Sequence, residues 1–312
     1  MYIKKRQGGV SLRGRFVHYK MHYVLMLPGI IFFIIFRYIP IYGVIIAFKD
    51  VMPFDGLKAM LTAPFVGFKH FITFFNSYYF WNIIGNTLSI SGLKLLFGFP
   101  APIILALLLN EVRSKQFKKA MQTISYLPHF LSWVVVAGLF TVILSTSGGM
   151  INEIVKAFGG NPIYFLGDPK YFRSLLVISE VWKSMGWGSI IYLAALSGIN
   201  PELYEAAIVD GAGRWRQMIH ITLPGMSYVV ILMFIFAIGN LLQAGFEQIL
   251  LLYSPSVYGV SDIIDTYVYR EGLIGMKYSY TTAIGLFKSI IAMTLIMSAN
   301  YLAKKMGKEG IW

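Results

Sequence analysis

The sequence predicts an all-α integral membrane protein with six transmembrane helices. Hydrophobic residues make up 57% of its 312 positions and charged residues only 13%, whereas soluble domains carry about 25% charged residues. The mean hydropathy is +0.65. Six apolar runs could each cross about 30 Å of hydrocarbon as a helix, the form expected where the bilayer offers the backbone no water. The runs cover roughly residues 24–47, 82–109, 121–145, 173–197, 228–252 and 281–303.

The first run follows a basic segment, residues 1–23, that contains no acidic residue. The run is too long for the core of a signal peptide and has no small-residue cleavage site. It is therefore expected to remain as a membrane span. Arg37 interrupts it, with Pro28 and Pro40 on either side.

The distribution of lysine and arginine predicts that both termini are cytoplasmic. Six spans put both ends on one side, which would carry 15 of the 27 basic residues against 8 on the other, and basic residues favour the cytoplasm. The chain then divides into a cytoplasmic N-tail (1–23), a six-helix transmembrane domain (24–304) and a cytoplasmic C-tail (305–312). Topology and attraction to anionic membrane lipid account for the net charge of +13, so no nucleic-acid partner is expected.

The segment between the first two runs, residues 48–81, is rich in aromatic residues and is expected on the outer side. This composition suits a helix that lies in the membrane interface. Two roles remain open for it: anchoring the chain at the interface, or helping to receive a substrate. Its aromatic residues include Phe54, Phe65, Phe68, Phe71, Phe74, Phe75, Tyr78 and Tyr79.

A polar loop at residues 198–227 separates the fourth and fifth runs and is typical of two short helices joined at a glycine corner. Asn200 can cap a helix that begins with Pro201. Gly211 and Gly213 interrupt that helix, because glycine permits backbone angles that other residues resist.

The second helix of this loop is expected from about residue 214, with one stripe of side chains at helical spacing. The stripe consists of Trp215, Met218, Ile219 and Thr222. Pro224 is expected to end the helix and to redirect the chain into the fifth span. Such a loop can be a rigid coupler between a soluble motor and the bundle, or an amphipathic hairpin resting on the bilayer. The residues alone leave both possibilities open.

Polar side chains inside the fourth and fifth runs are candidates for lining a substrate path, because polar groups in hydrocarbon tend to face a bundle interior or a cavity. The fifth-run set is Asn240, Gln243 and Glu247, and the fourth-run set is Glu180, Lys183 and Trp187. Each set has a spacing that places it on one helical face. Trp187 and Phe246 offer flat apolar faces to sugar rings. Alternatively, Glu180 and Lys183 neutralise each other, and the amides hydrogen-bond a neighbouring helix.

Three further cations, Arg37, Lys94 and Lys288, lie inside apolar runs. If they face the path they would favour acidic sugars, such as uronate oligomers. Snorkelling, or pairing with Glu180 or Glu247, would explain them equally well.

The sequence shows no catalytic constellation, so no catalytic residue, metal or bound cofactor is expected. The absence of cysteine excludes disulfides, thiol catalysis and cysteine-ligated metals. The five histidines show no metal-ligand spacing, and neither H-E-x-x-H nor G-x-S-x-G occurs. A G-x-x-x-x-G-K-[ST] motif is missing as well, so another chain would have to hold ATP.

The loop carries the pattern E-A-A, three residues, G, nine residues, I-x-L-P, which resembles the signature of permease subunits of binding-protein-dependent ABC importers. Here it is formed by Glu205, Ala206, Ala207, Gly211, Ile221, Leu223 and Pro224. Residues 198–204, leading into it, resemble the carbohydrate-importing branch, of which maltose importers are the familiar case. Residues 239–271, with 40–43 and 47–50, resemble permeases of oligosaccharide and polysaccharide fragments.

The resemblance implies the type I ABC importer permease fold in a bacterial cell membrane, with this chain forming half of a path for oligosaccharides. In that family the loop docks as a coupling helix into a groove on an ATPase. Glu205 would meet a basic residue there, and Gly211 would set the turn. The implied partners are a second permease, two ATPase subunits that hold ATP and Mg, and an extracellular solute-binding lipoprotein. The alternative, an ion-gradient-driven secondary sugar transporter, would need a complete path in one chain, usually with internal repeats; none is visible.

Overall fold

The computed structural model describes residues 19–52, 56, 58–305 and 307, and within them every regular element is a helix. The one β-type pairing in this part of the chain is an isolated bridge between Lys49 and Phe65. The all-α fold class is therefore confirmed for the described residues. The predicted tails, 1–23 and 305–312, lie mostly outside them.

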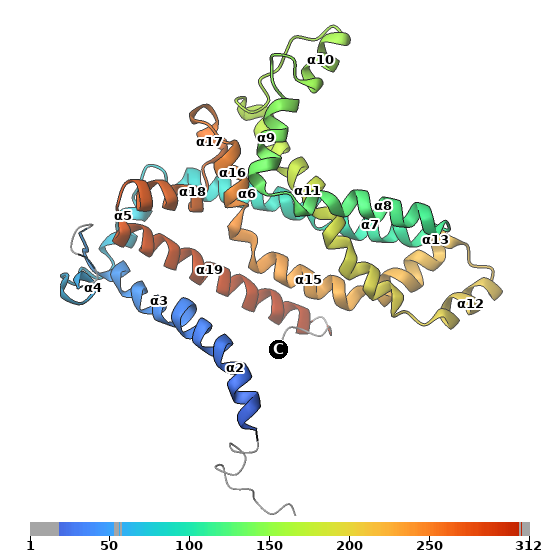
Figure 1. The fold of residues 1–312 in the computed structure, drawn as a ribbon, viewed down its shortest axis with the longest axis horizontal. Coiled ribbons are helices and arrows are strands. Elements are labelled where there is room, and N and C mark those ends of the chain that lie inside the picture. The colour runs from blue at the N-terminus through green and yellow to red at the C-terminus, as the bar shows by residue number, and fades with distance from the viewer. Residues whose placement is uncertain (1–18, 53–55, 57, 306, 308–312) are drawn as a thin grey trace, which may run out of the picture.

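The first predicted span is present as a continuous helical segment, Lys20–Phe48. Its parts are α2 (Lys20–Phe33), the π-turn η1 (Ile34–Tyr38), α3 (Ile39–Ile41) and the 3-10 segment η2 (Tyr42–Phe48). Pro40 lacks an N–H and its ring crowds the preceding turn, which accounts for the wider π-turn just before it. The α2 helix leans away from the bundle and is exposed along its whole length (Figure 1).

Two other predicted spans are also helices of sufficient length and hydropathy. In the second span, α6 (Phe80–Gly98) runs on into α7 (Pro100–Glu111), and α19 (Tyr278–Lys305) forms the sixth. Together with the first, they make three helices in the described residues that are long and apolar enough to cross a membrane.

The third predicted span is bent, so the expectation of one straight helix at 121–145 is wrong. Its parts are α8 (Lys115–Tyr126), the 3-10 turn η3 (Leu127–Phe130) and α9 (Trp133–Ile143). The two arms meet at 103°. Leu131 is extended between them, and the Ser132 side chain then caps α9. A new helix therefore begins inside the apolar run instead of the old one continuing.

The fourth run forms α11 (Pro169–Ser197), a single helix of 29 residues that the Asp168 side chain caps. It packs against α6, α7 and α8. Gly186 lies directly on the backbone of Ser125, where a larger side chain would collide. By length and composition α11 is not among the three apolar spans, because charged and small polar residues lower its hydropathy.

The fifth predicted span, 228–252, is broken, so the expectation of a continuous helix is wrong here too. It consists of α15 (Ser227–Gly239), one 3-10 turn η5 (Leu241–Gln243) and α16 (Phe246–Leu252). Ala244 and Gly245 have φ angles of +49° and +88°, in the left-handed region that ends a right-handed helix. Two bent helix pairs, Lys115–Phe130 with Trp133–Ile143 and Arg214–Gly225 with Ser227–Gly239, are also apolar enough, and if each counts as one span the described residues hold up to five.

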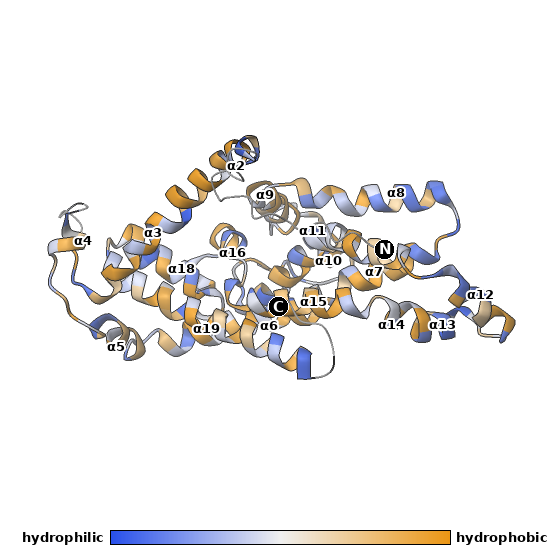
Figure 2. Cartoon of the chain, turned by 90° about the horizontal axis from the view of Figure 1, so that it is seen from below, coloured by the Kyte–Doolittle hydropathy of each residue, from blue (hydrophilic) through white to orange (hydrophobic). Residues whose placement is uncertain are grey.

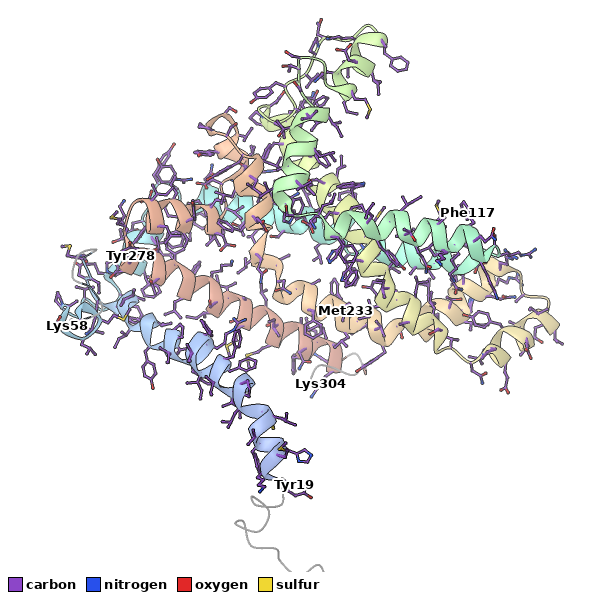
Figure 3. All side chains as sticks on the ribbon, in the orientation of Figure 1. Tyr19, Lys58, Phe117, Met233, Tyr278 and Lys304 are labelled. Atoms are coloured by element: carbon purple, nitrogen blue, oxygen red, sulfur yellow. The ribbon has the colours of Figure 1, made fainter. Side chains whose placement is uncertain are left out.

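Short helices lie along the edge of the molecule that runs from the left to the top of Figure 1. They are α4 (Ala59–Thr62), α5 (Lys69–Phe75), α10 (Met150–Ala157), η6 (Pro255–Val257), α17 (Tyr258–Ser261), α18 (Ile264–Val268) and η7 (Tyr269–Ile274). The start of α2, the end of α19 and the helix α12 (Pro201–Val209) lie toward the opposite edge (Figure 1). Figure 3 shows the same division: Lys58 and Tyr278 lie together, far from Tyr19, Lys304 and Phe117.

The aromatic segment at 48–81 is not one interfacial helix, as expected from its composition, but two short ones, α4 and α5. The Phe74 ring is buried and packs with Phe80 and Phe287. This segment is therefore anchored on α6 and α19. Figure 2 shows the contrast in hydropathy between α2, which is mostly hydrophobic, and α8, which mixes hydrophilic and hydrophobic residues.

Candidate functional site

The loop at residues 198–227, called the elbow below, forms the two predicted helices. α12 begins at Pro201, and the Asn200 side chain accepts a hydrogen bond from the N–H of Glu202 at 3.1 Å. This is the predicted cap, and it satisfies a backbone group that the first helical turn leaves free.

Gly211 makes the predicted corner. Its φ is +73°, and its N–H donates to Ile208 O while the N–H of Ala212 donates to Ala207 O. These two bonds form the Schellman arrangement that closes a helix C-terminus. Since a left-handed residue with a side chain is strained, glycine is the residue that fits this position.

The second helix begins at Arg214, as predicted, but Pro224 does not end it. The helical segment consists of α13 (Arg214–Gln217), the π-turn η4 (Met218–Thr222) and α14 (Leu223–Gly225). The π-turn accommodates the proline ring, and the bend of 60° into α15 follows at Met226. The predicted stripe is divided as well: Trp215 is exposed, whereas Thr222 is buried and hydrogen-bonds Tyr204 at 3.0 Å.

The outer surface of the elbow combines exposed apolar side chains with carboxylates that form no ion pair among the described residues, Glu202, Glu205 and Asp210. Glu205 is exposed. The exposed apolar side chains near it are Leu203, Ile208, Val209 and Trp215. Ala206 is exposed, Ala207 and Ile221 are half-buried, and Leu223 and Pro224 are exposed. Exposed large apolar side chains gathered in one loop are typical of a protein contact.

A cavity of about 510 Å³ lies between α6, α11 and α15, at the break in the fifth span. It brings together three of the predicted path residues, Glu180, Asn240 and Gln243, and the Gln243 amide donates to Asn240 at 2.9 Å. Ser91 also lines it, and its buried Oγ has no hydrogen-bond partner among the described residues. An unpaired buried hydroxyl costs free energy, so this wall is suited to a polar ligand.

Lys94 stabilises the break in the fifth span through its hydrogen bonds. Its Nζ donates to the carbonyl of Ala244 at 2.8 Å and to the Gln248 side chain, and it lies 3.5 Å from a carboxylate oxygen of Glu180. The fully buried Gln248 in turn donates to Leu176 O at 2.8 Å. This break node, Lys94, Glu180 and Gln248 around Ala244, satisfies the backbone where the helix is interrupted. Of the alternatives left open for Lys94, the structure shows pairing with Glu180, and Lys94 also lines the cavity.

Lys183 and Trp187 do not line this cavity with Glu180. The turn at η3 lies over that part of α11, and Lys183 Nζ donates to His129 O there at 2.8 Å. Trp187 stacks on the His129 ring, with centroids 4.6 Å apart. These two residues brace the bend between α8 and α9.

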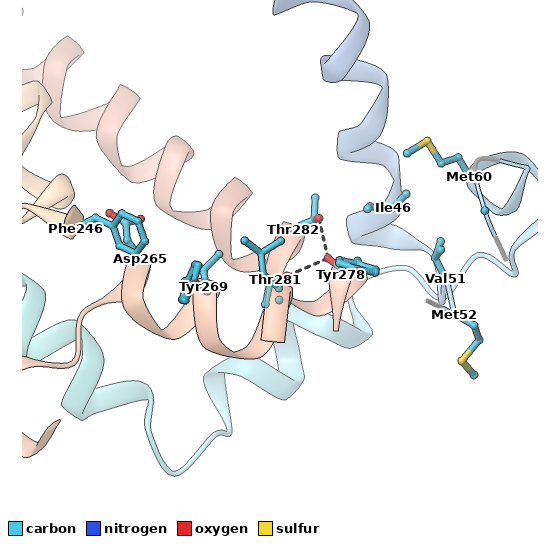
Figure 4. Close-up of a pocket in the computed structure, with 14 residues that line it drawn as sticks. Ile46, Val51, Met52, Met60, Phe246, Asp265, Tyr269, Tyr278, Thr281 and Thr282 are labelled. Carbon is cyan, nitrogen blue, oxygen red and sulfur yellow. Dashed lines mark hydrogen bonds between the residues drawn. The ribbon is translucent and has the colours of Figure 1, made fainter. Parts of the chain in front are cut away.

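Glu247 and Phe246 are also separated from Asn240 and Gln243, because the left-handed residues between them turn the chain. Glu247 is exposed. Phe246 lines a second, mostly apolar cavity of about 870 Å³, with Asp265 and Tyr269 close by (Figure 4).

The other predicted cations are also placed. Lys288 pairs with Asp265, at 2.6 Å, instead of with a glutamate. Arg37 is exposed on η1. Among the described residues, no group of three or more His, Asp or Glu side chains could hold a metal ion.

Gln248 and Ser91 were missed by the sequence reasoning. Gln248 follows Glu247 in an apolar run, so the sequence does show a polar amide there. No polar partner for that amide lies at helical spacing along the run. A lone serine in a span, such as Ser91, carries no signal that separates it from the other serines.

Membrane-length helices, a polar cavity between them and an exposed elbow define a membrane transport component. The chain belongs to the family described as binding-protein-dependent transport system inner membrane component, which matches residues 98–308. Its members are transport subunits and not enzymes.

Curated relatives match almost the whole chain. It is 46% identical to the polygalacturonan/rhamnogalacturonan transport system permease protein YteP of Bacillus subtilis (strain 168), over 99% of this chain and 96% of that protein. It is 45% identical to Protein LplB of the same organism, over 99% of this chain and 98% of that protein.

Solved structures give the fold. The chain superposes with a TM-score of 0.88 and 44% identity on a bacterial ABC transporter involved in the import of the acidic polysaccharide alginate, covering 95% of this chain and 99% of that one. A second structure of similar score holds the alginate transporter in complex with an alginate pentasaccharide-bound periplasmic protein. The fold is that of a type I ABC importer permease.

Proposed function

We propose that this chain is one permease of an ATP-driven importer of acidic oligosaccharides in a bacterial cytoplasmic membrane. The observation that carries the proposal is the elbow, a rigid helix corner whose surface exposes Glu205 together with apolar side chains. This surface is suited to dock on an ATPase subunit, with Glu205 meeting a basic residue and the corner at Gly211 transmitting the movement. The docking residues are Glu205, Ala206, Ala207, Gly211, Ile221, Leu223 and Pro224.

The topology follows from the same arrangement. The start of α2, the end of α19 and α12 lie toward one end (Figure 1), so an elbow in the cytosol would put both termini there. This supports the six-span topology, with α11, the bent segment α8–α9 and the broken segment α15–α16 completing the bundle. The exposed apolar α2 fits a lipid environment or the companion permease.

The partners are then a second permease, two ATPases that bind ATP and Mg, and an extracellular binding lipoprotein. One bundle makes half of the path. The cavity of about 510 Å³ at the break in the fifth span, called the membrane cavity below, would form part of that path. There Ser91, Asn240 and Gln243 offer polar groups for sugar hydroxyls, and Lys94 and Glu180 lie in the same wall. Four other candidate path residues lie outside this cavity and support the proposal less: Phe246, Glu247, Lys183 and Trp187.

The proposed substrate class rests on the relatives. One is named for polygalacturonan and rhamnogalacturonan transport, and the solved transporter imports alginate; all three are uronate-containing polymers. An ion-gradient-driven transporter is the alternative, and it predicts uptake that survives loss of the ATPase.

The test compares two glutamates on α12. Glu205→Lys should abolish co-purification of the ATPase and lower uptake of uronate oligomers roughly tenfold or more, because reversing an interfacial charge leaves its partner repelled. Glu202→Lys, on the same exposed helix, is the matched control and should retain both activities. Normal assembly and uptake with Glu205→Lys would refute the coupling role, and uptake without any ATPase would refute the ATP-driven class.

A further inference from the structure

A second polar cleft, of about 1000 Å³, lies at the end of the molecule away from the elbow, where α5 meets η7 and the start of α19. We call it the outer cleft. Five tyrosines line it: Tyr78, Tyr79, Tyr267, Tyr278 and Tyr280. Residues 69–79, which form one wall, belong to the aromatic segment for which the sequence left open a role in receiving substrate.

Two of these rings are presented to solvent. Tyr78 is 93% exposed and Tyr79 is 53% exposed, and their ring centroids lie 5.4 Å apart at 86°. Tyr267 and Tyr280 instead hold each other by a hydroxyl contact of 3.1 Å inside the wall. Exposed tyrosine faces beside hydroxyl and amide groups can bind a sugar ring by its apolar face and by its hydroxyls.

Two lysines stand on opposite walls of the same cleft. Lys69 pairs with Asp50 and Lys277 pairs with Glu271, each at 2.7 Å. The lysine side chains are 57% and 60% exposed, so each ammonium keeps donors that are not used by its partner.

In each ion pair the charged form of one member is favoured. The hydrogen bond from Lys69 lowers the pKa of the Asp50 carboxyl, and the hydrogen bond to Glu271 raises the pKa of Lys277. A carboxylate that enters the cleft can therefore bind the ammonium groups of Lys69 and Lys277 while each lysine stays paired with its acidic partner.

The outer cleft borders another cavity of the molecule. Val51, Met52 and Tyr278 line both this cleft and the apolar cavity that holds Phe246 and Asp265; Figure 4 shows Tyr278 beside Val51 at one end of that cavity. The cleft and the apolar cavity are thus adjacent, separated by these shared residues. Simple anchoring in the interface would explain exposed rings, but not a concave site with an ion pair on each wall.

We propose that the outer cleft is a carbohydrate subsite that binds a uronate unit of an oligosaccharide as it leaves the binding protein. The rings of Tyr78 and Tyr79 contact the sugar faces, and Lys69 and Lys277 bind the carboxylates. This inference rests on the proposed function. A short oligomer that fits within the membrane cavity does not need the subsite, whereas a longer one reaches it.

The experiment measures uptake of galacturonate dimers and pentamers by the complete transporter in proteoliposomes. Tyr78→Ala and Lys277→Gln should each raise the KM for the pentamer roughly threefold to tenfold, as expected for loss of one aromatic or charged contact. The KM for the dimer and the affinity for the binding protein should not change. Tyr78→Phe, which keeps the ring face, should recover most of the loss.

Matched controls lie outside the cleft. Tyr164 is an exposed tyrosine, and Lys156 forms an ion pair with Glu153 at 2.8 Å; Tyr164→Ala and Lys156→Gln should leave both KM values unchanged. An unchanged pentamer KM in the cleft variants would overturn the subsite. A weakened affinity for the binding protein with equal loss for dimer and pentamer would also overturn it, in favour of protein docking. Failure of the unaltered transporter to take up either oligomer would instead overturn the proposed substrate class.

Discussion

The elbow at residues 198–227 and the break at residues 239–246 are both places where a helix stops, but they are stabilised differently. In the elbow the hydrogen bonds are local: Tyr204 and Thr222 are 18 positions apart, and most other partners are closer. At the break, Lys94 donates to Ala244 over 150 positions. The hydrogen bonds of the elbow therefore lie within the loop, with one exposed ion pair from Arg214 to Glu111 of α7 at 3.6 Å, whereas the break depends on the packing of three spans.

This difference predicts two kinds of defect. A change in the elbow should disturb the contact with the motor and leave the bundle folded, because few bundle contacts depend on it. A change at the break should destabilise the bundle itself. The predictions below test this division, from the largest expected effect to the smallest.

Lys94→Met should have the largest effect. It removes the donor to the Ala244 carbonyl and leaves Glu180 without its counter-charge, and breaking a buried pair in this way costs about 3 kcal/mol. The midpoint of thermal unfolding of the purified transporter should fall, together with its yield. Adding Glu180→Gln to Lys94→Met should recover part of the stability, since no charge is then left unpaired. If Lys94→Met were as stable as the unaltered protein, the break would not depend on the break node.

Gly211→Ala should impair coupling while the bundle stays stable. A left-handed alanine costs about 1–2 kcal/mol, so the corner should open and uptake should fall several-fold. Gly213→Ala is the matched control, because Gly213 has a φ of −68° and open space around its Cα; it should transport normally. The division would be wrong if Gly211→Ala lowered the unfolding midpoint as much as Lys94→Met.

The same division explains what the sequence could predict. The residues that shape the elbow, Asn200, Pro201 and Gly211, act on neighbours within a few positions, so their spacing predicted both helices and the corner. Pro224 was misjudged because a π-turn absorbed it, and nothing in the local sequence distinguishes that solution from a helix end.

The interior of the bundle was less predictable, since the decisive partners are distant. Nothing beside Ala244 shows that Lys94 will satisfy its carbonyl, so an apolar run with two glycines, Gly239 and Gly245, still favoured a continuous helix. Similarly, the bend after α8 depends on Lys183 binding His129 O, 54 positions away. Helical spacing placed Glu180 and Lys183 on one face, but packing gave them different partners.

Tyr204→Phe should have the smallest effect of the three. The Tyr204 hydroxyl ties α12 to Thr222 at 3.0 Å, and losing one such bond costs about 1 kcal/mol; Thr222 keeps its bond to Gln217 O at 3.3 Å. Hydrogen exchange of the α12 amides should accelerate about fivefold, with the unfolding midpoint of the transporter unchanged. Tyr228→Phe is the control, because Tyr228 is half exposed and its hydroxyl has no partner among the described residues. Equal exchange in the two variants would mean that the Schellman corner alone holds the elbow, and that the contact between its two helices is dispensable.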